Sequence, residues 1–245
     1  MQEFEALRDQ PWTETFYDPG TADWTERWTL DGKLATVENS AAGMSFDSGP
    51  EFGDDAHHAV LWTRPSFEGD LKIEYDYTRT DEQTRAVNIL YLHATGSGVE
   101  PFDEDITRWA ELREVPAMRM YFNHMDLYHI SYAAFGNAND DAGDDYIRAR
   151  RYLPLAGKGL RGTALEPDVY SRTGLFATGV PHRITVIKRG NMLWMQVRND
   201  EQDYLCRWDV SGFPPIDHGR IGLRQMHARG AIYKDFKVST LASDE

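Results

Sequence analysis

The chain has a single cysteine, Cys206, among its 245 residues, which excludes an internal disulfide. Its setting, "DYLCRWDV", predicts a buried small hydrophobic side chain rather than a nucleophile. The chain also lacks a long apolar run, and its mean hydropathy of -0.59 argues against a membrane-spanning segment. The first residues, "MQEFEALRDQPWTETF", contain no basic stretch followed by an apolar one, so they do not resemble a secretion signal and we expect a cytoplasmic protein.

Basic residues are scarce: 26 lysines and arginines face 40 aspartates and glutamates, which gives a formal charge of -14. This balance argues against a nucleic-acid partner, because phosphate binding needs a basic face. It leaves an acidic ligand possible if arginines gather locally in one cleft. No linker divides the chain, so we expect one domain over residues 1–245, with strands and loops over residues 1–50.

Apolar residues mostly recur at a spacing of two, and short glycine, proline, asparagine and aspartate clusters interrupt them, which is an all-β pattern. The strands we predict are residues 57–63, 71–80, 86–95, 118–122, 128–135, 146–152, 182–190, 191–199, 219–226 and 231–240. The Gly-Asn turn in "KRGNML" predicts a hairpin, and the last two strands predict another. So many strands without disulfides favour a two-sheet jelly-roll sandwich with one concave face.

One segment between the predicted strands has apolar residues at helical spacing instead of a spacing of two. In "PFDEDITRWAELREVP", residues 101–116, acidic residues come first, apolar residues follow at helical spacing, and Pro116 ends the pattern. This predicts a short helix inserted between strands.

Several stretches carry a resemblance: "HHAVLWTRPSFEGDLKIEYDYTRTDEQTRAVNILYLHATGSG", "YHISYAAFG", "YIRARRY" and "GRIGLRQMHARGAIYKDFKV". Over most of residues 55–240 the chain resembles the YesU-like family of bacterial proteins. The resemblance implies a concanavalin A-like jelly roll of the lectin and glucanase superfamily. More distantly, the order of these strands is similar to domains that hydrolyse keto-disaccharides.

Polar side chains on alternate strand positions suggest a site, because alternate residues of a strand share one face. Arg224 alternates against the apolar pair Ile221 and Leu223, and His129 against Tyr128 and Ile130. We predict that one polar set converges on the concave face: Tyr91, His93, Arg119, Tyr121, His129 and Arg224, with Arg150 or Arg151 at its rim. Asn88 joins this set if a bulge turns it. Any one of these histidines or tyrosines alone is better explained as an ordinary surface residue, and only their accumulation favours a site.

The chain offers no carboxylate pair of the kind that jelly-roll glucanases use, because Glu74 and Asp76 read as a solvated outer face. The adjacent His57 and His58 point to opposite faces, which leaves no compact three-ligand metal set. We therefore predict neither a metal nor a cofactor.

Histidine, tyrosine and arginine without a carboxylate pair suit β-elimination from a uronic acid, in which an arginine offsets charge on the substrate carboxylate. We predict His129 as the base and Tyr121 as the acid, with His93 and the loop residue His124 as rival bases. Arg119 and Arg224 would hold the carboxylate of an anionic oligosaccharide or polysaccharide. The predicted substrate contacts are Tyr91, Asn88, Arg150 and Arg151.

The leaving group decides the enzyme class: a sugar makes a polysaccharide lyase, and water makes an oligosaccharide dehydratase. Two alternatives stay open. One is a glycoside hydrolase using Asp105 or Glu111 of the inserted helix, and the other is a non-catalytic carbohydrate-binding module.

Overall fold

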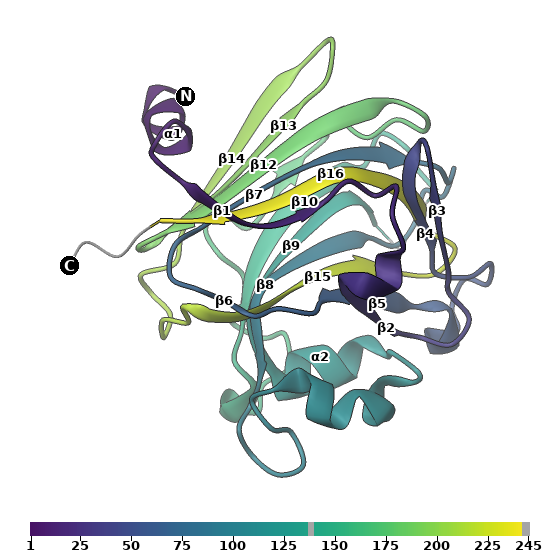
Figure 1. Ribbon diagram of the computed structural model, residues 1–245, viewed down its shortest axis with the longest axis vertical. Coiled ribbons are helices and arrows are strands. Elements are labelled where there is room, and N and C mark those ends of the chain that lie inside the picture. Colours follow the sequence, from purple (N-terminus) through teal and green to yellow (C-terminus); the bar gives the residue numbers. More distant parts are fainter. Residues whose placement is uncertain (137–139, 242–245) are drawn as a thin grey trace.

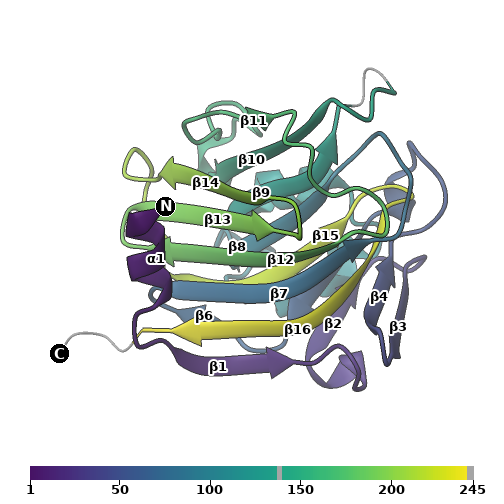
Figure 2. The same ribbon diagram turned by 90° about the horizontal axis from the view of Figure 1, so that it is seen from above.

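Alternating apolar and polar residues build two antiparallel β-sheets, which pack face to face in the computed structural model (Figure 1). The structure describes residues 1–136 and 140–241. Sheet A has the order β14 (Asp203–Asp209), β13 (Met192–Arg198), β12 (Pro181–Arg189), β7 (Leu71–Arg79), β16 (Gly230–Thr240), β4 (Gly43–Asp47) and β3 (Thr36–Ser40), and β1 (Thr13–Asp18) also pairs with β16. Figure 2 shows sheet A in front, with β14 to β1 side by side.

Sheet B has the order β11 (Tyr170–Ser171), β10 (Asp145–Tyr152), β9 (Met125–Phe135), β8 (Asn88–Gly96), β15 (His218–Gln225), β5 (Ala59–Thr63) and β2 (Trp28–Asp31), and β6 (Phe67–Glu68) pairs with β15. The predicted all-β jelly-roll sandwich is confirmed. Every predicted strand is present except 118–122, and the β12–β13 hairpin is confirmed. The second predicted hairpin is wrong, because β15 lies in sheet B and β16 in sheet A. Alternation identifies strands but does not identify their partners.

The core between the sheets follows from this alternation. On β7, Ile73, Tyr75 and Tyr77 point inward and are fully buried. Asp76 points outward and pairs with Arg183 of β12 at 3.1 Å, as expected for a solvated face. Cys206 of β14 is also buried in this core, in agreement with its predicted role as a small hydrophobic residue.

The helices are short: α1 (Gln2–Arg8), η1 (Trp24–Glu26), η2 (Asp55–His57), η3 (Ile106–Arg113), α2 (Met118–His124) and η4 (Pro154–Ala156). In the described part of the chain, none is long and apolar enough to cross a membrane. The predicted helix over residues 101–116 is present as η3, a 3-10 helix with a kink at Trp109. The N-terminal helix α1 was not predicted.

The predicted strand over residues 118–122 is instead helix α2. Five residues are too few to separate a strand from a helix by their pattern, and methionine and arginine are good helix formers. Tyr121 is fully buried, and Met118 and Phe122 are partly buried on the same helical face. This spacing of three and four residues is the helical one.

Residues 101–124, which we call the insert, cover the face of sheet B that is turned away from sheet A. We call this the outer face. Figure 1 shows α2 below sheet B, on the side opposite sheet A. A second hydrophobic cluster joins them: Ile106, Trp109 and Tyr121 of the insert pack with Val60, Trp62, Ile89, Tyr91 and Leu127 of the sheet. The insert is therefore held by apolar burial as well as by the polar contacts described next.

Asp31, at the end of β2, ties the insert to the sheet. Its Oδ2 atom accepts hydrogen bonds from Arg113 Nε at 2.6 Å, Trp62 Nε1 at 2.7 Å and the Tyr121 hydroxyl at 3.0 Å. The Asp31 and Arg113 side chains are only 3% and 1% exposed. Arg113 also donates to the Trp109 and Ile106 carbonyls, so it holds η3 in shape.

We expect Asp31→Ala to lower the free energy of unfolding by about 3–5 kcal/mol, because it leaves the buried Arg113 charge without a partner. Glu114→Ala is the matched control. Glu114 also joins the insert to the chain next to β2, through Lys33 at 2.6 Å, but both side chains are more than half exposed. Its loss should cost less than about 1 kcal/mol. Equal effects of the two substitutions in urea denaturation would show that Asp31 does not anchor the insert.

Candidate functional site on the outer face of sheet B

Strand register places the polar residues of the outer face in rows. One row runs from Arg150 through His129 and Tyr91 to Gly222. The next runs from Arg148 through Ser131 and Ile89 to Arg224. Directly opposed residues on neighbouring antiparallel strands have Cβ atoms about 5 Å apart. Polar side chains from the four strands β10, β9, β8 and β15 thus lie within a few side-chain lengths of one another.

Three aromatic rings fill the part of this face under the insert. Trp62, Tyr91 and Tyr121 lie nearly parallel, with ring centres 5.4 Å apart for Trp62 and Tyr91 and 5.9 Å apart for Tyr91 and Tyr121. Gly222 makes this possible, since a Cβ atom there would lie 2.5 Å from the Trp62 ring. The stack closes this half of the face.

His129 lies beside the stack and is hydrogen-bonded through both ring nitrogens. Nδ1 is 2.5 Å from the Tyr152 hydroxyl, and Nε2 is 2.5 Å from Ser131 Oγ. Burial, followed by the charges of Arg150 and Arg224, lowers the pKa of His129 well below its ordinary value. Burial raises the pKa of Tyr152 well above its ordinary value. The pair therefore consists of a neutral imidazole and a protonated phenol, which is the form that can accept one proton and donate another.

Arg224 is fully buried between the aromatic stack and residues of other segments. Its Nη2 donates to the Pro116 carbonyl at 2.5 Å and lies 2.8 Å from His58 Nδ1, and the guanidinium is 4.4 Å from the centre of the Tyr121 ring. Nε and Nη1 are buried and make no hydrogen bond of ordinary geometry with any described residue. The other fully buried arginines, Arg113, Arg151 and Arg229, pair with Asp31, Asp126 and Asp81. Arg224 has no such partner among the described residues.

Two half-buried arginines border the site on β10. Arg150 Nη1 donates to Thr163 Oγ1 at 3.2 Å, and Arg148 Nη2 lies 3.3 Å from the Asp168 carboxylate. Arg150 has no carboxylate partner among the described ion pairs. An acidic protein thus concentrates positive charge on one edge of the outer face.

The structure brings together five of the predicted site residues: Tyr91, Tyr121, His129, Arg224 and Arg150. Tyr121 arrives from α2 instead of from the predicted strand over residues 118–122. Its hydroxyl donates to Asp31, which turns it away from His129. The predicted rival base His124 stacks on Phe102 with ring centres 3.6 Å apart and is half buried in the insert.

The other predicted residues lie elsewhere. Asn88 points between the sheets and donates to the Tyr77 hydroxyl at 2.7 Å. Arg119 is exposed on α2, because that segment is helical. A bulge between Leu92 and Thr95 gives His93 a φ of 51° and turns it away from Tyr91.

His93 and Arg151 meet at one end of the sandwich, on either side of Tyr128. The His93 and Tyr128 ring centres are 6.5 Å apart, and the Arg151 guanidinium lies 5.2 Å from the Tyr128 ring. Arg151 also pairs with Asp126 and donates to the Pro214 carbonyl. Its placement follows from alternation, because Arg150 and Arg151 are adjacent on β10 and face opposite sides.

Sequence reasoning missed Tyr152 and Asp31. Tyr152 follows Arg148 and Arg150 at a spacing of two, so alternation alone could have placed it beside His129. Asp31 carries no local signal, since its partners are 31, 82 and 90 residues away. The hydrolase candidates Asp105 and Glu111 lie on the surface of the insert, where Asp105 accepts from the Thr107 backbone amide at 3.1 Å.

The adjacent histidines 57 and 58 do point apart, but the expectation that they leave no compact ligand set is wrong. Each joins a different group of side chains that could hold a metal ion. One group is Asp55, His58 and His227, and the other is Glu51, Asp54 and His57. His227 lies far along the chain, on the loop after β15, so spacing gave no sign of it.

Buried histidines should make the protein sensitive to acid. Burial lowers the pKa of His93 to about 3, whereas a histidine in an unfolded chain has a pKa of about 6.5. Below pH 6.5 the unfolded state therefore takes up a proton that the folded state refuses, so stability falls as pH falls. We expect His93→Leu to reduce the loss of unfolding free energy between pH 6 and pH 5 by about 1 kcal/mol. His218→Gln, at an exposed histidine, is the control, and an unchanged slope in His93→Leu would contradict the prediction.

No protein-family description and no curated protein matches this chain. Among solved structures, a Bacillus subtilis protein of unknown function with a galectin-like fold is 17% identical, with a TM-score of 0.67 over 93% of this chain and 97% of that one. The VIP36 exoplasmic/lumenal domain, solved with Ca2+ and Man3GlcNAc, is 10% identical, with a TM-score of 0.60 over 96% and 92%. The Bacillus subtilis carbohydrate-binding module CBM66 is 12% identical, with a TM-score of 0.50 over 87% and 95%. The chain thus has the galectin-like, concanavalin A-like fold, whose structural neighbours bind carbohydrates.

Proposed function

We propose that the outer face of sheet B binds an acidic saccharide, with Arg224 as the anchor for a carboxylate or sulfate group. The observation that supports this is the fully buried guanidinium without a carboxylate partner. A buried charge is expensive unless it is paired, so a ligand that supplies the missing anion would gain the whole of that pairing. Arginine's planar fork also matches the two oxygens of a carboxylate.

The surroundings of Arg224 favour a sugar as the carrier of that anion. Once the border of the insert opens, Tyr91 and Tyr121 would offer flat ring surfaces, and Ser131, His129 and Tyr152 would offer hydrogen-bonding groups in the adjoining rows. Lectins and a carbohydrate-binding module share the fold. Arg150 and Arg148 would meet a second acidic group or guide the ligand inward.

Access would come from the border of the hydrophobic cluster under the insert. There Val87, Met118 and Met226 are only partly buried, and Arg148 and Arg150 on the same sheet are half-buried. Methionine side chains are flexible and adapt to a ligand. Binding would then displace side chains at this border and leave the Asp31 anchor in place.

Arg224→Met tests this proposal, because methionine keeps the volume and removes the charge. We expect binding of an oligoglucuronate to weaken by about 10-fold to 100-fold. Removal of an unpaired buried charge should leave the unfolding free energy of the free protein unchanged or raise it. Calorimetric titration and urea denaturation measure the two effects.

Arg207→Gln is the control for nonspecific charge, since Arg207 is about half exposed on β14 of the other sheet. A neutral oligosaccharide of the same length is the control for the ligand. Equal affinity of wild type and Arg224→Met for the acidic ligand would contradict the proposal, as would equal affinity of the wild type for the neutral one.

β-Elimination is the second candidate, and the contact between His129 and Tyr152 favours it. His129 would take the proton α to the carboxylate as the C–H bond breaks and the C=C bond forms. Tyr152 would protonate the leaving oxygen as the C–O bond breaks. The 2.5 Å contact between Nδ1 and the hydroxyl would then return the proton from His129 to Tyr152. This closes the cycle without another reagent. Tyr152 replaces Tyr121 as the acid, because Tyr121 donates to Asp31.

Elimination creates an unsaturated uronate, which absorbs in the ultraviolet. An ultraviolet absorbance screen of uronate-containing oligosaccharides would identify a substrate. On that substrate, we expect His129→Ala and Tyr152→Phe each to lower turnover by on the order of a hundredfold or more. His124→Ala, in the insert, should keep near-normal turnover. Binding of acidic saccharides without any new absorbance would leave the protein as a binding module. Full activity of a folded His129→Ala variant would exclude His129 as the base.

A further inference from the structure

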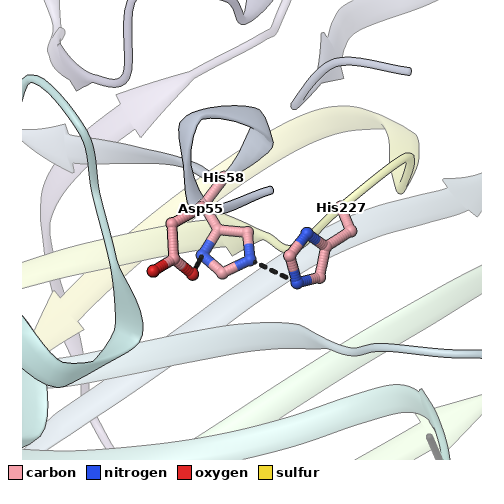
Figure 3. Close-up of side chains that lie close together, drawn as sticks. All are labelled: Asp55, His58 and His227. Atoms are coloured by element: carbon pink, nitrogen blue, oxygen red, sulfur yellow. Dashed lines mark hydrogen bonds and ion pairs between the residues drawn. The ribbon is translucent and has the colours of Figure 1, made fainter. Parts of the chain in front are cut away.

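We propose that Asp55, His58 and His227 form a binding site for one divalent transition-metal ion with six-coordinate preference. Figure 3 shows the three side chains together, with His58 between the other two. His58 follows η2, and His227 lies on the loop between β15 and β16. Two imidazoles and one carboxylate from separate segments are a familiar donor set for such ions. The site uses no residue of the proposed acid–base pair.

The two histidine rings share a hydrogen bond between their Nε2 atoms, and the rings are folded toward each other. Their Nε2 atoms are 2.8 Å apart, while the ring centres are 3.9 Å apart and the planes are inclined by 68°. A linear N–H···N bond at that distance would hold the ring centres about 5 Å apart. The nitrogen lone pairs therefore point off the line between the rings. In Figure 3 the two Nε2 atoms face each other, and the Asp55 carboxylate lies beside Nδ1 of His58.

Each imidazole has a backbone carbonyl near the nitrogen that would carry the proton, but His58 Nδ1 also accepts from Arg224 Nη2 at 2.8 Å, a contact that must shift before Nδ1 can donate. A ligating histidine usually donates its other N–H to a carbonyl or carboxylate. His58 Nδ1 lies 3.3 Å from the Pro116 carbonyl and 3.8 Å from Asp55 Oδ1. A hydrogen bond with the Asp54 backbone supports a proton on His227. Burial favours the neutral form of both rings, with the pKa of His58 lowered to about 2.

His227 is held in place by a constrained backbone. Its φ is 32°, and the next residue, Ala228, has a φ of 48°. Two successive non-glycine residues in the left-handed region are costly, so the surrounding structure must hold them there. Ala228 N donates to the Gly49 carbonyl, and Gly53 N donates to His227 Nδ1 at 3.2 Å. The hydrogen bond from Gly53 N to His227 Nδ1 must break when Nδ1 carries a proton. Metal binding at Nε2 would therefore move the His227 ring proton from Nε2 to Nδ1.

Charges around the site oppose one another. Arg224 Nη2 lies 2.8 Å from His58 Nδ1 and disfavours a cation. The segment 51–55 supplies three exposed carboxylates, those of Glu51, Asp54 and Asp55. Three carboxylates against one guanidinium leave a net negative surrounding. This net negative charge favours a divalent cation in spite of the nearby guanidinium.

The spacing of the nitrogens favours one coordination geometry over another. With metal–nitrogen distances of about 2.1 Å, a separation of 2.8 Å gives an angle near ~85°, which fits neighbouring positions of an octahedron. A tetrahedral zinc ion would need the nitrogens about 3.4 Å apart. Asp55 is half exposed, so it is free to rotate into a third position. Iron(II), cobalt(II) and nickel(II) fit this description, with water in the remaining positions.

Cobalt(II) is the probe, because its visible spectrum distinguishes six-coordinate from tetrahedral sites. Untagged protein would be titrated with Co2+ by calorimetry and by absorbance. We expect one ion per chain with a weak six-coordinate spectrum. His227→Gln should weaken binding by at least about 100-fold, since even outer contacts of metal ligands are worth 10–100-fold. Asp55→Asn, at an exposed side chain whose loss should not unfold the protein, should weaken it about 10-fold or more.

Two control variants separate this site from other histidines. His218→Gln, at an exposed histidine, should bind Co2+ like the wild type. Glu51→Gln, in the neighbouring group with Asp54 and His57, should weaken binding by less than Asp55→Asn. No Co2+ binding, a tetrahedral spectrum, or binding that is lost in Glu51→Gln and kept in Asp55→Asn would each overturn the proposal. None of these outcomes depends on whether the outer face binds a saccharide.

Discussion

The buried carboxylate of Asp31 is the interaction on which the outer face depends. The sandwich core is apolar and forms by alternation along the strands, without help from the insert. The insert has only short helices, and isolated helices of this length are not stable in water. It keeps its shape because Arg113 and Tyr121 converge on one carboxylate at the end of β2. Without Asp31, the insert would no longer be held over the stacked rings of Trp62 and Tyr91.

That cover explains why the candidate site is so enclosed. One face of an antiparallel sheet is commonly open to solvent, but here Tyr121 and Pro116 lie over Arg224. Enclosure strengthens every electrostatic interaction, because the local dielectric constant is low. It also makes an unpaired charge costly, which is why Arg224 stands out among the buried arginines. The unpaired charge of Arg224 lowers the stability of the fold, and such a loss of stability is common at sites that bind or react.

Arg224 also connects the two proposed sites. One side of its guanidinium faces Tyr91 and Tyr121, and the other touches His58, whose ring meets His227. An ion bound at His58 would add positive charge next to Arg224, and an anion bound at Arg224 would offset it. By reciprocity, each ligand would then favour the other. The proposed anion site and the proposed cation site would thus lie back to back across one side chain.

The sequence by itself determined the all-β sandwich, most strand positions and which side of each strand faces the core. These follow from a period of two and from turn residues, both of which are local. It correctly placed His129 opposite Tyr128 and Ile130, and Arg224 opposite Ile221 and Leu223.

Only the tertiary structure decided the rest of the site. A bulge turned His93 away, a helix replaced the strand carrying Arg119, and strand partners were set by packing that alternation does not encode. Asp31 acts through contacts with residues 31 to 90 positions away in the sequence. His58 meets Pro116 and His227 across 58 and 169 positions. Local patterns report which face a side chain occupies. Which distant side chains meet there depends on how the whole chain closes.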